Sequence, residues 1–303
     1  MNNLILISTQ FQLLNAVELI DEHLKGQEFK AMLLIKNKNH FNQIKKIAIK
    51  NNIDIISVVK YQTILQYFSL FFQSFKFKKI ETLIIGNCRD NLVLLLLKLL
   101  KFKNLYAVDD GNIIDTHHIK PNIHRQHLPL KFYTIFNLNS NAYYDFLLND
   151  FKKLKKNKSN QTGKNSEKFF FIGQPLSEQG LIDKESFIRI MEKINNKFHD
   201  NIIYILHPSE KEDKFISNGK IKTIRLNTSI EDHLISLESL PSKVVGFYST
   251  ALSSLSKIFN SEEVEINFID IEKHQKIKKT YFGKPHGFNH YQYLKKNVEE
   301  ILI

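Results

Sequence analysis

Three short motifs contain the side chains best suited to chemistry, and each follows a run of apolar and β-branched residues. They are Asp109-Asp110-Gly111, His207-Pro208 and Ser249-Thr250. Such runs predict strands, and open α/β sheets bind ligands beyond the carboxyl ends of their strands. A carboxylate can accept the proton of a hydroxyl, an imidazole can donate to a phosphate, and hydroxyls can hold that phosphate. The three motifs together suit the transfer of a sugar from a phosphate leaving group.

The acid pair is the best candidate for a general base. A carboxylate beside another carboxylate has its proton affinity raised by like-charge repulsion, and either Asp109 or Asp110 can benefit from this. Gly111 allows the backbone to turn where a side chain would block a substrate. The alternative is an Asp-Gly turn that only closes a strand.

His207 and the hydroxyl pair belong to the second half of the chain. Pro208 restrains His207 toward an extended backbone that aims the imidazole out of the strand, where it could donate to a departing phosphate. Ser249-Thr250 stands between a predicted strand and a predicted helix, so free helix N–H groups and hydroxyls could bind a phosphate without a metal. An ordinary local hydrogen bond for the histidine and an N-cap for the serine are the alternatives.

In this order the motifs resemble those of bacterial sialyltransferases, and most closely those of glycosyltransferase family 52, the lipooligosaccharide sialyltransferases. Further landmarks are Gln12 to Ala16, which match a Gln-Leu-Leu-Asn-Ala helix start, and Gly173-Gln174-Pro175, which match a turn that opens the second half. The resemblance implies an inverting, metal-independent sialyltransferase without a cofactor. Its donor would be the CMP derivative of N-acetylneuraminic acid or a related nonulosonic acid, and its acceptor a terminal galactose-type sugar of lipooligosaccharide or capsule.

The resemblance also implies roles for single residues. Asp109 would be the base, Asp110 would position it or the acceptor, and His207 would assist the departure of CMP. Glu231 would hold the ribose hydroxyls, with a helix-capping role as the alternative. The remaining donor-binding candidates are Gly173, Gln174, Pro208, Ser249 and Thr250, and the candidates for the acceptor or the cleft are Thr9, Gln10, Gln12 and Gly111.

Strand and helix patterns alternate along the chain, which predicts parallel sheets. Strands are predicted at 4–7, 29–35, 53–59, 82–85 and 104–108, and again at 169–172, 202–206, 221–225, 243–247 and 264–269. This is the α/β pattern of the GT-B type, in which two Rossmann-like domains face each other across a cleft.

The same pattern divides the chain into domains. We expect an acceptor-side domain at 1–155 that carries the base, a linker at 156–168 and a CMP-sugar-binding domain at 169–285. Residues 286–303 are expected to form a final helix that could pack on the first domain. A helix is also expected at 63–75.

The formal charge of +12 in 303 residues is large, and lysines concentrate at 75–79, 98–103, 152–158 and 276–279. Nucleic acid, anionic lipid and charged substrates could each explain it, although an AT-rich genome would also enrich lysine. Because no zinc-finger spacing or RNA-binding motif is present, we expect no nucleic acid but a membrane surface that presents a glycolipid. No signal-like segment opens the chain, so we expect a cytoplasmic protein, peripheral on the inner membrane face.

Metal sites are not expected. Cys88 is the only cysteine, and His117, His118, His124 and His127 lack regular ligand spacing, which favours an acceptor-side loop.

Two rival functions remain open. One is a metal-dependent glycosyltransferase that uses a nucleoside diphosphate sugar, with the acid pair as metal ligand. The other is a non-enzymatic basic α/β protein that binds nucleic acid or a protein.

Overall fold

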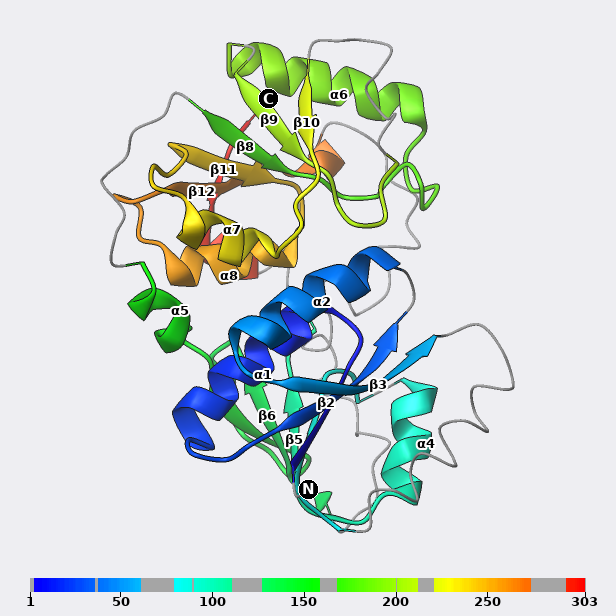
Figure 1. Cartoon of the computed structure of the whole chain (residues 1–303). Coiled ribbons are helices and arrows are strands. Elements are labelled where there is room, and N and C mark those ends of the chain that lie inside the picture. The colour runs from blue at the N-terminus through cyan, green and yellow to red at the C-terminus, as the bar shows by residue number, and fades with distance from the viewer. Residues whose placement is uncertain are drawn as a thin grey trace. The chain divides into compact units, whose positions relative to one another are not determined.

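The chain forms two compact units, residues 1–153 with 227–229 and residues 154–226 with 230–303. Each unit is built around its own parallel sheet (Figure 1). The expected helix at 63–75, most of the expected linker and Gly111 lie outside the described residues. The computed structural model describes residues 3–35, 38–60, 79–88, 90–110, 127–158, 168–199, 201–211, 221–273 and 293–302.

The first unit contains a seven-stranded parallel sheet in the order β3-β2-β1-β4-β5-β6-β7. The strand order reverses between β1 and β4, which makes this the topological switch point of the unit. Its elements are β1 Asn3–Ile7, α1 Gln10–His23, β2 Lys30–Ile35, α2 Lys38–Lys50, β3 Asp54–Lys60, β4 Ile80–Ile85, α4 Asn91–Leu99, β5 Phe102–Val108, β6 Leu130–Thr134 and β7 Tyr144–Leu148.

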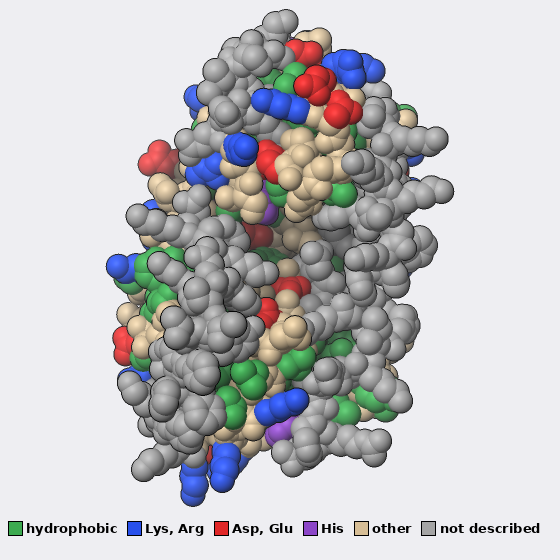
Figure 2. Space-filling view, turned by 90° about the vertical axis from the view of Figure 1, so that its right-hand side faces the viewer, with side chains coloured by type: hydrophobic (Ala, Val, Ile, Leu, Met, Phe, Trp, Pro, Cys, Tyr) green, Lys and Arg blue, Asp and Glu red, His purple; other side chains and the backbone are tan. Residues whose placement is uncertain are grey.

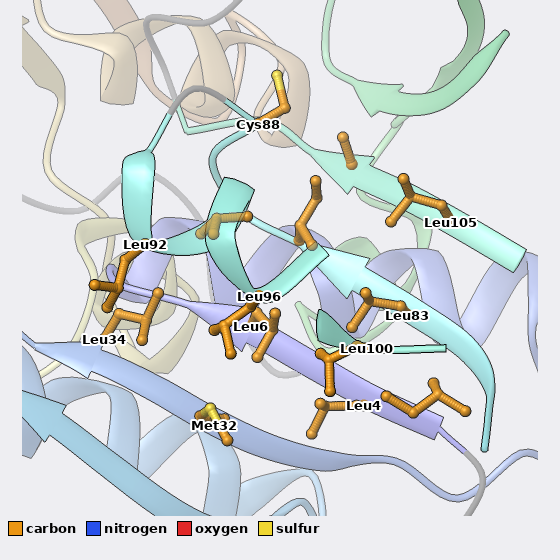
Figure 3. Packing of buried hydrophobic residues seen from close by; sticks show 14 of the residues in the cluster. Leu4, Leu6, Met32, Leu34, Leu83, Cys88, Leu92, Leu96, Leu100 and Leu105 are labelled. Atoms are coloured by element: carbon orange, nitrogen blue, oxygen red, sulfur yellow. The ribbon is translucent and has the colours of Figure 1, made fainter. Parts of the chain in front are cut away.

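This sheet has a hydrophobic core on each face, because successive side chains of a strand point to opposite sides. Leu6 of β1 belongs to one buried cluster and Ile5 to the other. Leu92 and Leu96 of α4 cover the first cluster, as Figure 3 shows, while α1 and α2 cover the second. Cys88 is 1% exposed within the first cluster, so packing explains the presence of the only cysteine in the chain.

The second unit contains a six-stranded parallel sheet in the order β10-β9-β8-β11-β12-β13, with its switch point between β8 and β11. Aromatic rings fill its core. The Phe171 ring lies 5.5 Å from that of Tyr204 and 5.0 Å from that of Phe247. The elements are α5 Lys152–Lys156 at the boundary, β8 Phe169–Ile172, α6 Lys184–Lys197, β9 Ile202–Ile205, β10 Lys222–Ile224, α7 Ile230–Ser236, β11 Lys243–Gly246, α8 Thr250–Ile258, β12 Glu265–Phe268, the 3-10 turn Ile271–Lys273 and β13 Glu299–Glu300.

All of the predicted strands are present, and their ends agree with the prediction to within two residues. The prediction missed β6 and β7, and it assigned a helix to the C-terminal segment. Residues 293–297 are helical, but Glu299–Glu300 form β13 beside β12 in the second unit. The strand forms because the outer edge of β12 offers unpaired backbone groups, and the Ile301 N–H bonds the Phe268 carbonyl at 2.8 Å. Residues 299–302 are therefore not part of a final helix.

Candidate active site

The loops that follow β8, β9 and β11 carry the donor-side candidates, and β8 has both of the other strands as neighbours. Gly173-Gln174 directly follows β8, His207-Pro208 follows β9 after one residue, and Ser249-Thr250 follows β11 after two. Because the strands are parallel, all three loops leave the sheet at the same edge, and the switch point lies among them.

A buried amide joins two of these loops. Gln174 is 8% exposed, and its Oε1 accepts a hydrogen bond from the Tyr248 backbone N–H at 3.0 Å. The Tyr248 hydroxyl in turn donates to the buried carboxylate of Asp270 after β12, and the Lys295 ammonium lies 3.6 Å from that carboxylate. The loops are thus connected to one another by polar side chains and not only by the sheet beneath them.

The ring of His207 is half-buried, and its Nδ1 accepts a hydrogen bond from the Ser209 backbone N–H at 3.1 Å. A neutral imidazole that accepts at Nδ1 carries its proton at Nε2. A doubly protonated ring would bring two N–H groups against each other here, so the turn favours the neutral ring. In this tautomer the Nε2–H of His207 is a hydrogen-bond donor. Pro208 is also half-buried.

Ser249 is the N-cap of α8, and its Oγ accepts from the Ala251 backbone N–H at 3.3 Å. Thr250 is the first residue of the helix, and both side chains are half-buried. The capping alternative is therefore realised for Ser249. It leaves the Thr250 hydroxyl and the positive end of the α8 dipole at the edge where the three loops emerge.

Glu231 lies in the first turn of α7 and is 3% exposed. Its Oε1 accepts a hydrogen bond from the Ser254 hydroxyl of α8. The carboxylate therefore joins α7 to α8, in addition to its favourable place at a helix start.

In the first unit, burial separates the two members of the acid pair. Asp109 is completely buried, and its Oδ2 accepts from the Thr134 hydroxyl at 2.8 Å and from the Ile135 N–H at 3.4 Å. Asp110 is half-buried. Asp109 thus ties the end of β5 to the end of β6, and Asp110 is the acid that retains contact with solvent.

A buried amide pair supports the same strand end. The Asn15 Nδ2 of α1 donates to the Asp109 backbone carbonyl at 3.2 Å, and the Asn149 Nδ2 donates to the Asn15 Oδ1 at 2.6 Å. The Tyr133 hydroxyl lies 2.9 Å from the Glu22 Oε2 and 3.2 Å from the Asn149 Oδ1, and its single proton is shared between these two acceptors. Burial, followed by its bond to Glu22, raises the pKa of Tyr133 well above its usual value, so the phenol stays a donor.

The three cleft candidates near the N-terminus serve mainly to start α1. Thr9 is the N-cap, and Gln12 completes a capping box in which its Oε1 accepts from the Thr9 N–H at 3.3 Å. The Gln12 side chain is 1% exposed and fills the space above Gly86, where an added Cβ would come within 2.2 Å of its Oε1. Gln12 therefore occupies the switch point of the first unit. Gln10 is half-buried, and its Oε1 has no partner among the described residues.

Comparison with known proteins adds a family. A family model described as alpha-2,8-polysialyltransferase (POLYST) matches residues 116–267, which is half of the chain. The chain belongs to this family. The matched segment includes all three donor-side loops and starts shortly after the acid motif. Membership confirms the expectation of a glycosyltransferase from a sialyltransferase family, while the resemblance to glycosyltransferase family 52 in particular stays a prediction.

Solved structures support the fold of this polysialyltransferase-family protein. It is similar to UDP-GlcNAc 2-epimerase from Methanocaldococcus jannaschii in complex with UDP-GlcNAc and UDP, with a TM-score of 0.55 and 13% identity over 99% of this chain and 89% of that chain. A second structure of that enzyme gives 0.52 and 12% over 98% and 93%. The expected GT-B-type pair of Rossmann-like domains is confirmed. No curated protein matched the chain.

Among the residues that the structure describes, no group of three or more His, Cys, Asp or Glu side chains is arranged so that it could hold a metal ion. Of the expected histidine cluster, only His127 is described, and its ring lies 4.4 Å from that of Phe102. His117, His118 and His124 lie outside the described residues.

The side chains that hold the motifs in place were not among the predicted site residues. They are chiefly Asn15, Tyr204, Glu210 and Asn149. Only one of them left a readable signal. Glu210 stands three residues after His207, the spacing at which an acidic side chain can return to a backbone N–H, as in a capping box. Asn15 and Asn149 bond residues far away along the chain, and Tyr204 bonds a side chain in the loop after its own strand. No regular spacing in the sequence marks these contacts.

Proposed function

We propose that the protein transfers a nonulosonic acid, most simply N-acetylneuraminic acid, from its CMP derivative to a glycan acceptor. The observation that carries this proposal is the gathering of Gln174, His207 and Thr250 at the switch point of the second unit, within the segment that matches the polysialyltransferase family. An anionic nucleotide suits this edge, because a helix start and an imidazole N–H both favour a phosphate.

In the proposed mechanism the start of α8 and the Thr250 hydroxyl hold the CMP phosphate. Glu231 was expected to hold the ribose, but its carboxylate is buried and bonded to Ser254, so we give it the role of supporting the start of α8. The His207 Nε2–H donates to the phosphate oxygen as the bond from that oxygen to the anomeric carbon breaks. The acceptor hydroxyl attacks the anomeric carbon from the opposite side and gives its proton to a carboxylate. A single displacement of this kind inverts the anomeric centre and needs neither a metal nor a cofactor.

We assign the base to Asp110. Asp109 was the expected base, but its carboxylate is fully buried and bonded to Thr134, whereas Asp110 is half-buried. A base must reach the proton that it accepts, so exposure favours the second acid. Asp109 and Asn15 then fix the peptide from which the Asp110 side chain leaves.

The name of the family bears on the acceptor. Galactose was expected, whereas a polysialyltransferase extends a chain of sialic acids, which favours a terminal sialic acid joined by an α-2,8 linkage. We propose such a sialylated glycan as the preferred acceptor and lipooligosaccharide or capsule as its source. The acceptor would then be an anion, which agrees with the formal charge of +12.

We also propose that the enzyme works at the inner membrane face. Lysine side chains are exposed at the end of α4, where Lys98 and Lys101 lie, and along α5, where Lys155 and Lys156 lie. Figure 2 shows another face, on whose upper part Lys and Arg side chains lie among Asp and Glu side chains. The proposed attachment is electrostatic, between anionic lipid and the lysines at the end of α4 and along α5. No described helix has the length and apolar character needed to cross a bilayer.

The test is a transfer assay with the purified chain. CMP-N-acetylneuraminic acid is incubated with a galactoside or with a sialylated galactoside, with and without EDTA, and products are identified by mass spectrometry. We expect added sialic acid on the sialylated acceptor, unaffected by EDTA. Activity that EDTA abolishes would favour the metal-dependent alternative, and the absence of transfer to either acceptor would reject the proposal.

A further inference from the structure

The backbone around His207 is held by a four-residue turn that ends at Glu210. The Glu210 N–H donates to the His207 carbonyl at 2.9 Å, and the Glu210 Oε2 accepts from the His207 N–H at 2.7 Å. Arg225 of the neighbouring chain segment donates to the carbonyls of both residues, at 3.1 Å to His207 and 2.7 Å to Glu210. The N–H and the carbonyl of His207 are therefore both fixed, which determines where its Cβ points.

The Glu210 carboxylate is itself anchored from below. It is 4% exposed, and its Oε1 accepts from the Tyr204 hydroxyl of β9 at 2.6 Å. Burial, followed by the charge of Glu210, raises the pKa of Tyr204 well above its usual value, so the phenol remains a donor throughout the physiological range. A buried carboxylate with two donors is costly to disturb and holds its position.

Gly173 lies so close to this carboxylate that a side chain at this position would clash with it. A Cβ on Gly173 would lie 2.3 Å from the Glu210 Oε2, 2.6 Å from the Tyr204 Cε1 and 2.7 Å from the Ile205 carbonyl. The Gly-Gln-Pro turn after β8 thus leaves space for Glu210, and the same turn sends Gln174 to the loop after β11.

We propose that Glu210 is a positioning residue, whose buried carboxylate holds the His207 turn so that the imidazole keeps Nδ1 on the Ser209 N–H and presents its Nε2–H to the leaving phosphate. The role given to His207 rests on the proposed function. The placement of the ring by Glu210 can be measured independently of any substrate. Glu210 contacts neither donor nor acceptor in this scheme and acts only through the histidine.

The test compares Glu210→Ala with Glu185→Ala, which removes an exposed glutamate of α6 in the same unit. Two quantities are measured: kcat and KM with CMP-N-acetylneuraminic acid, and the ring nitrogen NMR shifts of His207. We expect Glu210→Ala to lower kcat about 10- to 100-fold with little change in donor KM, because small misplacements of catalytic groups cost this much. The ring shifts should change from an Nε2–H pattern to a mixture of tautomers. Glu185→Ala should match the wild type in both.

Glu210→Gln keeps the result decisive if the alanine variant does not fold. Its amide oxygen can still accept from the His207 N–H, so we expect wild-type ring shifts and a kcat within a few-fold of wild type. Wild-type ring shifts in Glu210→Ala, or a large loss of kcat in Glu210→Gln with the ring unchanged, would overturn the proposal. If the wild type does not use the CMP donor, the proposed function fails, and the ring shifts still decide whether Glu210 positions His207.

Discussion

Two neighbouring aspartates have different roles in this protein because one is buried and the other is partly exposed. Asp109 and Asp110 are adjacent and chemically identical, yet the first is enclosed by β6 and the second reaches solvent. The sequence could place the pair at a strand end, but it could not say which carboxylate would be enclosed. That depends on β6, whose pairing with β5 brings Thr134 to Asp109 and which the sequence pattern did not reveal.

Separate substitutions should distinguish the two acids. We expect Asp110→Asn to lower transfer by about 100-fold or more, the usual contribution of a general base, with CMP affinity by calorimetry unchanged. Asp109→Asn retains an oxygen for the Thr134 hydroxyl and should keep most of the activity. Asp109→Ala should lower the free energy of unfolding by about 1–3 kcal/mol, because buried donors lose their partner. An inactive Asp109→Asn beside an active Asp110→Asn would return the role of base to Asp109.

A second prediction at this scale concerns Glu22. Burial acts to raise its pKa, but hydrogen bonds from Lys152 and Tyr133 outweigh burial and hold the pKa below the usual value of 4.5. A lowered pKa in the folded state adds stability above pH 4.5, and this stability disappears as the pH falls through the lowered value. Urea unfolding between about pH 6 and about pH 3 should therefore show a smaller acid loss for Glu22→Gln than for the wild type. Identical pH profiles would contradict the ion pair.

At the scale of elements, the sequence predicted the strands that have a clear local hydrophobic pattern. The strands are runs of β-branched and aromatic residues, and both sheets follow from their alternation with helices. The strands that were missed are short or mixed in character: β6 contains Lys131, β7 contains Asp145, and β13 has two residues. The site was predictable as a set of strand ends. Several side chains that brace it, such as Asn15, Gln174 and Arg225, bond residues that are distant in the sequence, and no local pattern encodes those contacts.

Two glycines at neighbouring strand ends make a matched pair for testing this bracing. A Cβ on Gly173 would come within 2.3 Å of Glu210, whereas a Cβ on Gly246 would meet its nearest neighbour, the Ile172 carbonyl, at 3.4 Å. We expect Gly173→Ala to lower the free energy of unfolding by about 1–3 kcal/mol through overpacking, and Gly246→Ala to change it by less than about 1 kcal/mol. Denaturant titration measures both. Equal stability of the two variants would show that the Glu210 carboxylate can move aside at little cost.

At the scale of the whole molecule, the two units divide the proposed chemistry. The proposed base belongs to the first sheet, and the groups proposed to hold the nucleotide belong to the second. The family match covers all of the donor-side loops but not the acid motif. What relates the chain to its family is thus mainly the part that we assign to the donor.

The net charge gives a prediction for the molecule as a whole. We expect binding to vesicles that contain phosphatidylglycerol, little binding to phosphatidylcholine alone, and release at high salt. Reversal of Lys155 and Lys156 to glutamate should weaken binding by more than about tenfold, since each lysine near an anionic surface contributes about 1 kcal/mol. The same reversal at the exposed Lys193 and Lys197 of α6 is the control. Equal effects of the two double variants would point to net charge alone, and equal binding to both lipids would reject electrostatic attachment.

The bond between Gln174 and Tyr248 has a consequence for engineering. Because it fastens one loop to the next across the switch point, neither loop can be exchanged alone without stranding a hydrogen-bonding group of the other. Grafts intended to change the activated sugar should therefore carry both segments as one cassette. Acceptor preference, if it resides in the other unit, could be redesigned without touching that cassette.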